Sequence, residues 1–249
     1  MYTLNARSLF HLSWRKVAFL LLLLLGLCPL LLQGQRRDLG NYNFYDFQTK
    51  PYYFGITLAI NRASFLPFRS RDFIYSDSIQ SVESIDGPGF NLGIVTNLKI
   101  GQYFDFRFLP TLSFAERNLR YDRESRVRDF TQRKVTSVLV EMPFHFRYKS
   151  APYRDKRLFV IAGIKYNFDV ASDSRTRQAE TLVKISPHDF AIEYGAGIQF
   201  FFPYFIFSPE FKVSHGIGNT LIFNPNLEES TVLEKILSRT FTVSFHFEG

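Results

Sequence analysis

The stretch YFDFRFLPTLSF, Tyr103–Phe114, alternates large apolar side chains with mostly polar ones. Successive side chains of a β-strand point to opposite faces, so these two sets must meet two different environments. The apolar set is Phe104, Phe106, Phe108, Leu112 and Phe114, and the other set is Asp105, Arg107, Leu109, Thr111 and Ser113. Such a strand needs an apolar medium against its aromatic face and partners for the charges on the other face.

The same alternation recurs in eight segments of the chain. A period of two residues predicts strands rather than helices, and only Leu227–Leu237 is a candidate for a short helix. The eight segments are Tyr53–Asn61, Gly89–Ile100, Tyr103–Arg117, Val135–Tyr148, Arg157–Ala171, Asp189–Phe201, Tyr204–His215 and Arg239–Phe247. The chain is therefore expected to be all-β.

The connections between these segments alternate in length. Short connections follow the second, fourth and sixth segments: Gly101–Gln102, Lys149–Lys156 and Phe202–Pro203. Long connections follow the other segments: Arg62–Pro88, Asn118–Lys134, Ser172–His188 and Gly216–Ser238. Short periplasmic turns and long outer loops are typical of outer-membrane barrels. We predict an eight-stranded antiparallel transmembrane β-barrel of the outer membrane, whose even strand count places both chain ends in the periplasm.

A soluble β-sandwich or a lipocalin-like barrel is the structural alternative. It would carry the apolar face inside and the charges outside, and the period alone does not distinguish the two arrangements. The sequence contains 29 Phe and 13 Tyr among 249 residues, and its last predicted strand ends at the aromatic Phe247. This aromatic density, together with the alternating loop lengths, favours the membrane.

The polar parity of the predicted strands carries charges of both signs. Eight strands enclose an interior that side chains nearly fill, and buried charges need partners. We therefore predict a polar network in the lumen, with Asp105 and Arg107 facing Glu141 and Arg147 on the next strand; a gated conduit or a functional polar core is the alternative. The predicted network is Asp105, Arg107, Glu141, His145, Arg147, Lys165, Asp169, Glu193, Glu210 and Lys212.

Three prolines, Pro110, Pro143 and Pro209, lie inside predicted strands. Proline cannot donate a hydrogen bond to a neighbouring strand, and a closed barrel has no edge to accommodate it. The favoured interpretation is a set of β-bulges that shape the wall. A weakened seam, or a docking point within the bilayer, is the alternative.

The first 34 residues have the layout of a secretory signal peptide. A basic region holding Arg15 and Lys16 precedes an apolar core, Val17–Leu32, which at 16 residues is shorter than the ~20 of a spanning helix. A retained anchor is the alternative. The predicted organisation is a signal peptide at 1–34, a periplasmic lead at 35–51 and the barrel at 52–249. Removing residues 1–34 takes away the only Cys and the only Trp and lowers the net charge from +7 to +4.

The residues give little support to catalysis. A catalytic centre needs a nucleophile and a base within hydrogen-bond reach, and nothing marks such a pair among the four histidines that follow the signal peptide. The chain has no closely spaced His or Cys pairs of the kind that bind zinc. We therefore predict no enzyme, no cofactor and no metal site. The modest remaining positive charge also argues against nucleic acid as a partner.

The predicted loop Asn118–Lys134 is rich in arginine. It holds Arg120, Arg123, Arg126, Arg128, Arg133 and Lys134 beside Asp122, Glu124 and Asp129. Because arginine pairs well with phosphate, the loop is a candidate contact for lipopolysaccharide on the outer face. A solvated loop of mixed charge is the alternative.

Several long strings of the sequence resemble the PorT family, also called SprT, of the type IX secretion system. The most specific string is GPGFNLGIVTNLKIGQYFDFRFLPTLSFAERNLRY, Gly87–Tyr121. The similarity continues in RKVTSVLVEMPFHFRYKS (Arg133–Ser150), RLFVIAGIKYNFDVASD (Arg157–Asp173), FFFPYFIFSPEFKVSHGIGN (Phe200–Asn219) and SRTFTVSFHFE (Ser238–Glu248). The resemblance covers nearly all of the chain that follows the signal peptide.

This resemblance implies an outer-membrane component needed to export cargo with C-terminal signal domains, in bacteria where the same system supports gliding motility or secreted proteases. It implies that the protein is not an enzyme and binds no cofactor. The expected partners are other type IX secretion components, in addition to outer-membrane lipid and lipopolysaccharide. Eight strands are too few for an aqueous channel, which takes about 16 to 18. We therefore expect an accessory or assembly factor rather than the conduit. The alternatives are a general outer-membrane barrel, either a small porin or a loop-presenting adhesin, and, more remotely, a lipid-modifying enzyme.

Overall fold

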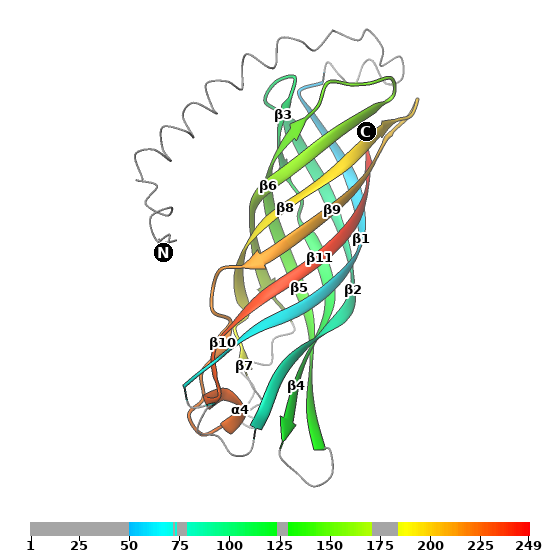
Figure 1. The fold of residues 1–249 in the computed structure, drawn as a ribbon. Coiled ribbons are helices and arrows are strands. Elements are labelled where there is room, and N and C mark those ends of the chain that lie inside the picture. Colours follow the sequence, from blue (N-terminus) through cyan, green and yellow to red (C-terminus); the bar gives the residue numbers. More distant parts are fainter. Residues whose placement is uncertain (1–49, 72, 74–78, 124–128, 171–183) are drawn as a thin grey trace, which may run out of the picture. The chain divides into compact units, whose positions relative to one another are not determined.

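The structure, a computed structural model, describes residues 50–71, 73, 79–123, 129–170 and 184–249 (Figure 1). The predicted signal peptide and nearly all of the predicted lead lie outside these residues. The elements are β1 (Tyr52–Arg69), β2 (Ile79–Lys99), β3 (Phe104–Phe108), β4 (Thr111–Arg123), β5 (Asp129–Lys149), β6 (Lys156–Asp169), β7 (Lys184–Ile185), β8 (His188–Phe201), β9 (Ile206–Gly216), β10 (Leu221–Ile222), α4 (Glu228–Thr231) and β11 (Leu233–Glu248).

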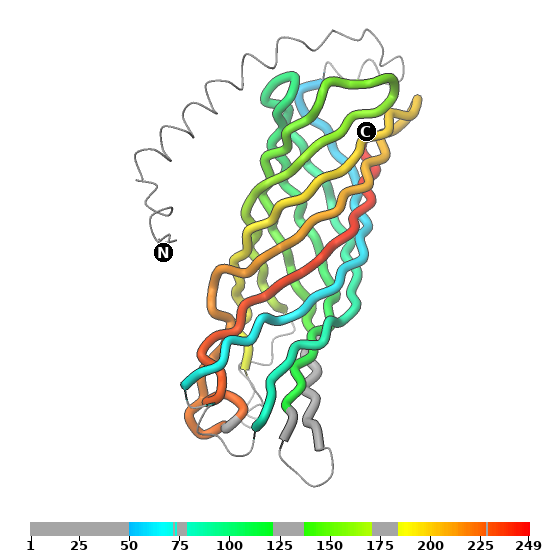
Figure 2. The backbone as a smooth tube through the Cα atoms, in the orientation of Figure 1, coloured from blue at the N-terminus to red at the C-terminus, as the bar shows by residue number. Residues whose placement is uncertain are grey.

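The long strands close into one antiparallel ring. Its order is β1, β11, β9, β8, β6, β5, then β3 with β4, and β2, which pairs with β1 again. β3 and β4 together occupy one position in the ring, so eight strands form the wall, and each runs obliquely around it (Figure 2). The predicted eight-stranded antiparallel barrel is confirmed.

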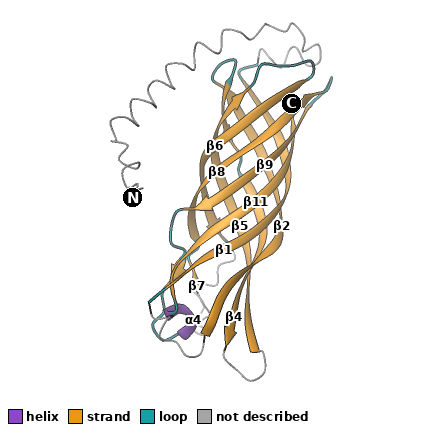
Figure 3. Ribbon diagram, in the orientation of Figure 1, coloured by secondary structure: helices purple, strands orange, loops and turns teal. Residues whose placement is uncertain are grey.

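The two ends of the barrel differ. The connections at residues 100–103, 150–155 and 202–205 are short and lie at the end where the chain terminates after β11 (Figure 3). We call this the short-turn end. The opposite, long-loop end carries β7, β10 and α4, and no helix among the described residues is long and apolar enough to cross a bilayer.

The strands extend further toward the long-loop end than the alternation predicted. The segments 62–69, 79–88, 118–123 and 129–134, expected as loops, are strand. The candidate helix Leu227–Leu237 is helical at Glu228–Thr231 (α4), while 233–237 belongs to β11. The arginine-rich loop is therefore mostly the two arms of the β4–β5 hairpin. Arg62 and Pro67 interrupt the apolar alternation of β1, which hid the extension in the sequence.

The three strand prolines produce no bulge. Pro110 lies between β3 and β4, yet Phe108↔Phe144 and Thr111↔Glu141 keep the same register on either side of it. The register is likewise continuous through Pro143 between β5 and β6 and through Pro209 between β9 and β11. The bulge interpretation was wrong. Among the described residues, the register shifts of these long strands fall toward the long-loop end instead, at Phe68/Arg69, Ile79/Ser81 and Asp86/Gly89.

Pro110 and Pro143 lack the N–H donor, but each still accepts a hydrogen bond from the neighbouring strand. The carbonyl of Pro110 accepts a bond from Ile94 N at 3.0 Å, and the carbonyl of Pro143 accepts one from Leu109 N at 3.2 Å. Losing one N–H at Pro110 and at Pro143 therefore leaves the neighbouring pairing in place. Beside Pro209, the pairing of β8 with β9 is interrupted between Gly197↔Glu210 and Phe200↔Phe207.

The wall is apolar outside and polar inside over most of its length. Outward positions of β1, β2 and β5 hold exposed aromatic and aliphatic side chains such as Ile56, Ile94 and Phe146. Inward positions of the same strands hold buried Thr57, Asn97 and similar residues. A soluble sheet would reverse these faces, so the arrangement suits surrounding lipid and a packed polar interior.

A second, apolar core fills the long-loop end. It joins inward side chains of β1, β2, β4, β10 and β11 beneath the loops. Its buried members are Phe65, Ile79, Val82, Leu119, Tyr121, Leu221, Val232, Leu233 and Ile236, with Phe73 and Ile185 packed against it. We call this set the outer core.

Candidate functional site in the barrel interior

The structure places nine of the ten predicted lumen residues in buried positions. The exception is Asp169, which is half-buried near the end of β6. The buried residues come from β3, β5, β6, β8 and β9, whose polar parity points inward because the Phe-rich parity faces out.

Nearest the short-turn end, Asp105 is the shared acceptor. Arg147 approaches one of its carboxylate oxygens at 2.5 Å, and Lys149 approaches the other at 2.5 Å. The guanidinium of Arg147 also donates to the Tyr53 hydroxyl. The predicted pairing of Asp105 with Arg147 across neighbouring strands is thus present.

Arg107 lies at the centre of the next group. Its two terminal nitrogens donate to Glu210 at 2.8 Å and to Glu248 at 2.9 Å, and all three side chains are buried. His246 Nε2 lies 3.5 Å from Glu210. The expectation that Arg107 pairs with Glu141 was wrong: its partners come from β9 and β11, because the lumen is narrow enough for an arginine to reach across it.

A third group surrounds Glu193 on β8. His145 contacts one of its carboxylate oxygens at 2.7 Å, Lys165 contacts the other at 3.0 Å, and Lys212 lies 3.7 Å away. Lys165 also reaches Glu141 at 3.4 Å. The His145 ring fits because Gly163 lies opposite it on β6, where an added Cβ would stand 2.9 Å from the ring and 2.0 Å from the Phe144 carbonyl oxygen.

Closer to the outer core the interior becomes less charged. The Ser113 hydroxyl donates to Asn91 at 2.9 Å, and Asn61 donates to the same amide oxygen. Ser238 donates to Asp189 at 2.6 Å. Arg117 lies over the ring of Phe65 at 5.2 Å, where the polar lumen meets the outer core.

The described lumen residues balance in charge. Six buried Lys or Arg side chains face six buried carboxylates. The cations are Arg107, Arg117, Arg147, Lys149, Lys165 and Lys212, and the carboxylates are Asp105, Glu141, Asp189, Glu193, Glu210 and Glu248. Burying a charge is costly unless it is paired and hydrogen-bonded, and most of these groups are held in the ion pairs described above, which lowers the cost of an ionic interior.

Sequence reasoning missed several members of the network. Glu248 binds Arg107 and also accepts from Gln199 at 3.1 Å, although the last predicted strand stopped one residue earlier, at Phe247. Its inward position follows from the parity of Thr242, Ser244 and His246, which would have revealed it. Tyr53 could not be recognised in the same way, because it is an aromatic residue at an inward position of β1, a strand predicted from its outward apolar residues.

No group of three or more His, Cys, Asp or Glu side chains within the described ranges is arranged to hold a metal ion. The interior is instead a set of ion pairs and hydrogen bonds that spans the barrel from wall to wall. Its chemistry is that of a packed, polar filling.

Comparisons with solved structures give small bacterial surface barrels at low similarity. The attachment invasion locus protein Ail of Yersinia pestis is 12% identical, with a TM-score of 0.33, covering 80% of this chain and 100% of its own. OprG of Pseudomonas aeruginosa is 9% identical, with a TM-score of 0.44 and coverage of 80% and 95%. Neisserial surface protein A is 10% identical, with a TM-score of 0.41 and coverage of 80% and 97%.

No curated protein matches the chain. The family model described as outer membrane protein beta-barrel domain matches residues 36–221, which is well over half of the sequence. The match includes most of the wall and most of the charged lumen described above. This chain is a member of the outer membrane protein beta-barrel domain family, and such proteins lie in the bacterial outer membrane.

Proposed function

We propose that this barrel is an accessory or assembly component of the type IX secretion system, needed for export of cargo with C-terminal signal domains and, through it, for gliding motility where the system supports it. The support for this role is the PorT-like sequence, whose strings run through β2, β3, β4, β5, β6, β9 and β11. We propose that residues 1–34 export the chain as a cleaved signal peptide.

The observation that carries the accessory role is the filled interior. Arg107 alone connects β3 with β9 and β11 through buried ion pairs of 2.8 and 2.9 Å. Beyond the ionic groups, the outer core occupies the long-loop end. A polypeptide in transit would have to displace both fillings, and eight-stranded barrels have room only for their own side chains or one small ligand. The barrel therefore acts through its wall, its turns or its outer extension.

Two classes of partner fit these surfaces. The short turns and the chain end after β11 face the periplasm in barrels of this kind, where soluble secretion components meet them. The β4–β5 hairpin contains strand residues of the arginine-rich segment of the sequence, and the long loops of outer-membrane barrels face outward, where lipopolysaccharide phosphates lie. We assign no catalytic activity to the chain.

Deletion of the gene tests the role in secretion. We expect cargo with type IX C-terminal domains to accumulate in the periplasm and to reappear outside the cell when the full chain is restored. A restored chain carrying Arg107→Lys is the informative variant, because it keeps the central charge but contacts fewer carboxylate oxygens. Normal secretion by the deletion strain would refute the proposal.

Planar bilayer recording tests the accessory assignment separately. The purified barrel is expected to give no stable large-conductance openings. Large openings by the intact chain would identify a conduit and overturn the accessory role, whatever the deletion strain secretes.

A loop-presenting adhesin is the second candidate. The observation that favours it is the outer core, which holds the extended strands together at the long-loop end. Adhesion lost on deletion while type IX cargo is still secreted would select this function. The filled lumen counts against a small porin.

A further inference from the structure

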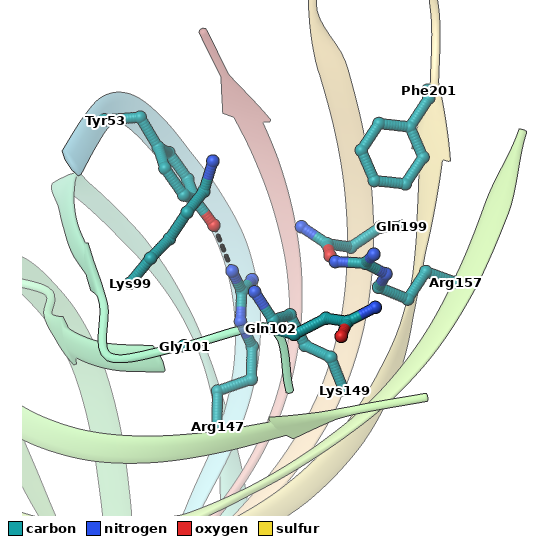
Figure 4. A pocket seen from close by; sticks show the side chains of 9 residues that line it. All are labelled: Tyr53, Lys99, Gly101, Gln102, Arg147, Lys149, Arg157, Gln199 and Phe201. Carbon is teal, nitrogen blue, oxygen red and sulfur yellow. Dashed lines mark hydrogen bonds between the residues drawn. The ribbon is translucent and has the colours of Figure 1, made fainter. Parts of the chain in front are cut away.

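A small cavity opens into the lumen at the short-turn end (Figure 4). We call it the vestibule. It has a volume of about 90 Å³ and is lined by Tyr53, Lys99, Gly101, Gln102, Arg147, Lys149, Arg157, Gln199 and Phe201. Four of these side chains are cationic and none is a carboxylate. The volume is that of about three water molecules at ~30 Å³ each, enough for one carboxylate or phosphate group.

Arg157, at the start of β6, lines the vestibule and takes no part in the ion pairs of the lumen described above. It forms no ion pair with any described residue, and its Nε is buried without a hydrogen-bond partner. Its guanidinium lies 5.8 Å from the centre of the Phe201 ring, which holds the group against the cavity wall. A buried guanidinium donor without an acceptor is costly, and a bound anion would satisfy it.

Arg147 supplies a second unsatisfied donor. Its Nη1 is buried without a hydrogen-bond partner, and the nearest carboxylate, Glu248, lies 3.6 Å from it. Asp105 gives this nitrogen no acceptor, because Arg147 Nε and Nη2 donate to one of its oxygens and Lys149 donates to the other. The vestibule thus has two forked guanidinium groups and more positive charge than the carboxylates behind it can balance.

The position of the vestibule limits which anion can reach it. Gly101 and Gln102 belong to a short turn, and the short-turn end faces the periplasm in barrels of this kind. The lining side chains lie inside the ring of strands, whereas phospholipid headgroups lie around its outside. The volume admits the end of one acidic side chain, and the Gln102 amide and the Phe201 ring add neutral surface to the guanidinium groups, which suits a carboxylate on an aliphatic stem better than a bare inorganic ion.

We propose that the vestibule binds an acidic side chain of a periplasmic polypeptide, with the carboxylate between Arg157 and Arg147. Arginine forks pair with carboxylates through parallel hydrogen bonds, and burial strengthens such pairs. This site does not depend on the chain taking part in type IX secretion.

The test uses the full chain purified from outer membranes into lipid nanodiscs. The probe is a synthetic peptide, acetyl-Gly-Glu-Gly-Glu-Gly-amide, measured by calorimetry against the same peptide with Gln in place of Glu. We expect the Glu peptide to bind at least tenfold more tightly. Inorganic phosphate forms a third arm and is expected to bind more weakly than the Glu peptide.

Two charge variants provide the matched comparison. Arg157→Gln removes one of the two vestibule guanidinium groups and is expected to weaken Glu-peptide binding at least tenfold. Lys156→Gln removes one positive charge from the adjacent, exposed residue at the same end of β6, and is expected to change binding less than twofold. Circular dichroism checks that both variants keep the barrel.

Three results would overturn the proposal: equal binding of the Glu and Gln peptides, no binding of the Glu peptide at millimolar concentration, or equal losses in the two variants. Phosphate binding that matches or exceeds that of the Glu peptide would identify a phosphate site and would also reject the peptide ligand.

Discussion

The interior of this barrel consists of two regions with opposite chemistry, and single strands pass through both. On β11, the inward side chains change from Glu248 and His246 at the short-turn end to Ile236 and Leu233 in the outer core. The outward side chains change in the other sense, from Phe247 and Phe245 to residues such as Lys235 and Glu234. One continuous strand is therefore polar inside and apolar outside near the short-turn end, and apolar inside and polar outside near the long-loop end.

The difference follows from what surrounds each region. Where lipid covers the wall, the outside must be apolar, and the narrow interior can then hold charges only as matched pairs. Where water covers the wall, the outside becomes polar and the inside can collapse like the core of a soluble domain. If the surrounding medium sets the difference, substitutions in the two regions should affect stability in different ways.

The largest effect is expected from breaking the central ion pairs of the lumen. Arg107→Ala leaves Glu210 and Glu248 without their shared partner. Removing one side of a buried pair costs about 3–5 kcal/mol, because the remaining charge stays buried. Urea unfolding in lipid vesicles, followed by circular dichroism, measures the loss; the only Trp lies in the predicted signal peptide.

Arg107→Lys is the control for this prediction. It keeps the positive charge but has one ammonium group in place of a fork, so it should lose only part of what Arg107→Ala loses. Equal losses in the two variants would mean that packing, and not charge pairing, stabilises the lumen.

The next largest effect is expected from a charge placed on the outside of the wall, whose cost in unfolding free energy should differ between the two regions. Ile94 is exposed on the apolar face of β2, and Ile94→Arg is expected to cost about 2–4 kcal/mol if this face lies near the bilayer midplane. Glu83 is exposed on the same strand beside the outer core, and Glu83→Arg is expected to change the unfolding free energy by less than about 0.5 kcal/mol. Similar costs at both positions would place both regions in the same medium.

A smaller loss of unfolding free energy is expected when the space around the His145 ring is reduced. Gly163→Ala adds a Cβ that would stand 2.0 Å from the Phe144 carbonyl oxygen and 2.9 Å from the His145 ring. Overpacking of this kind costs about 1–3 kcal/mol. The matched control is Gly101→Ala in a short turn, where an added Cβ meets nothing within 4 Å. Equal stability of the two variants, measured by the same urea unfolding, would show that the ring has room to move.

Much of this architecture was predictable from alternation and loop length alone. The strand count, the antiparallel order and the inward parity of Asp105, Arg107 and Arg147 all follow from a period of two residues. The cross-lumen partners of Arg107 did not follow, because alternation shows which face a residue occupies and says nothing about which distant strand lies opposite. The choice of Glu210 and Glu248 depends on the closure and tilt of the ring.

The outer core was hidden for a different reason. Strand prediction relied on apolar residues facing out, and in the extension the apolar residues face in. At Asp86/Gly89 a register shift changes the parity of β2, so Val82 and Phe90 share even numbers yet face opposite ways. The alternation of apolar residues along one parity of β2 fails at this point, so the predicted strand ends there. The vestibule was equally invisible, since its lining comes from strands that are distant in sequence.

The smallest effect is expected inside the outer core. Ile236→Val removes one methylene from a fully buried side chain and should cost about 0.5–1.5 kcal/mol. Leu237→Val makes the same reduction at the next, half-buried and outward position and should cost less than about 0.5 kcal/mol. If the outer core is a separate unit, Ile236→Val will speed proteolysis at the β4–β5 hairpin while the urea midpoint of the lumen strands stays nearly unchanged, since local opening needs only the weaker unit to unfold. A shift of the whole unfolding transition without faster local cleavage would instead mean that the two regions fold as one.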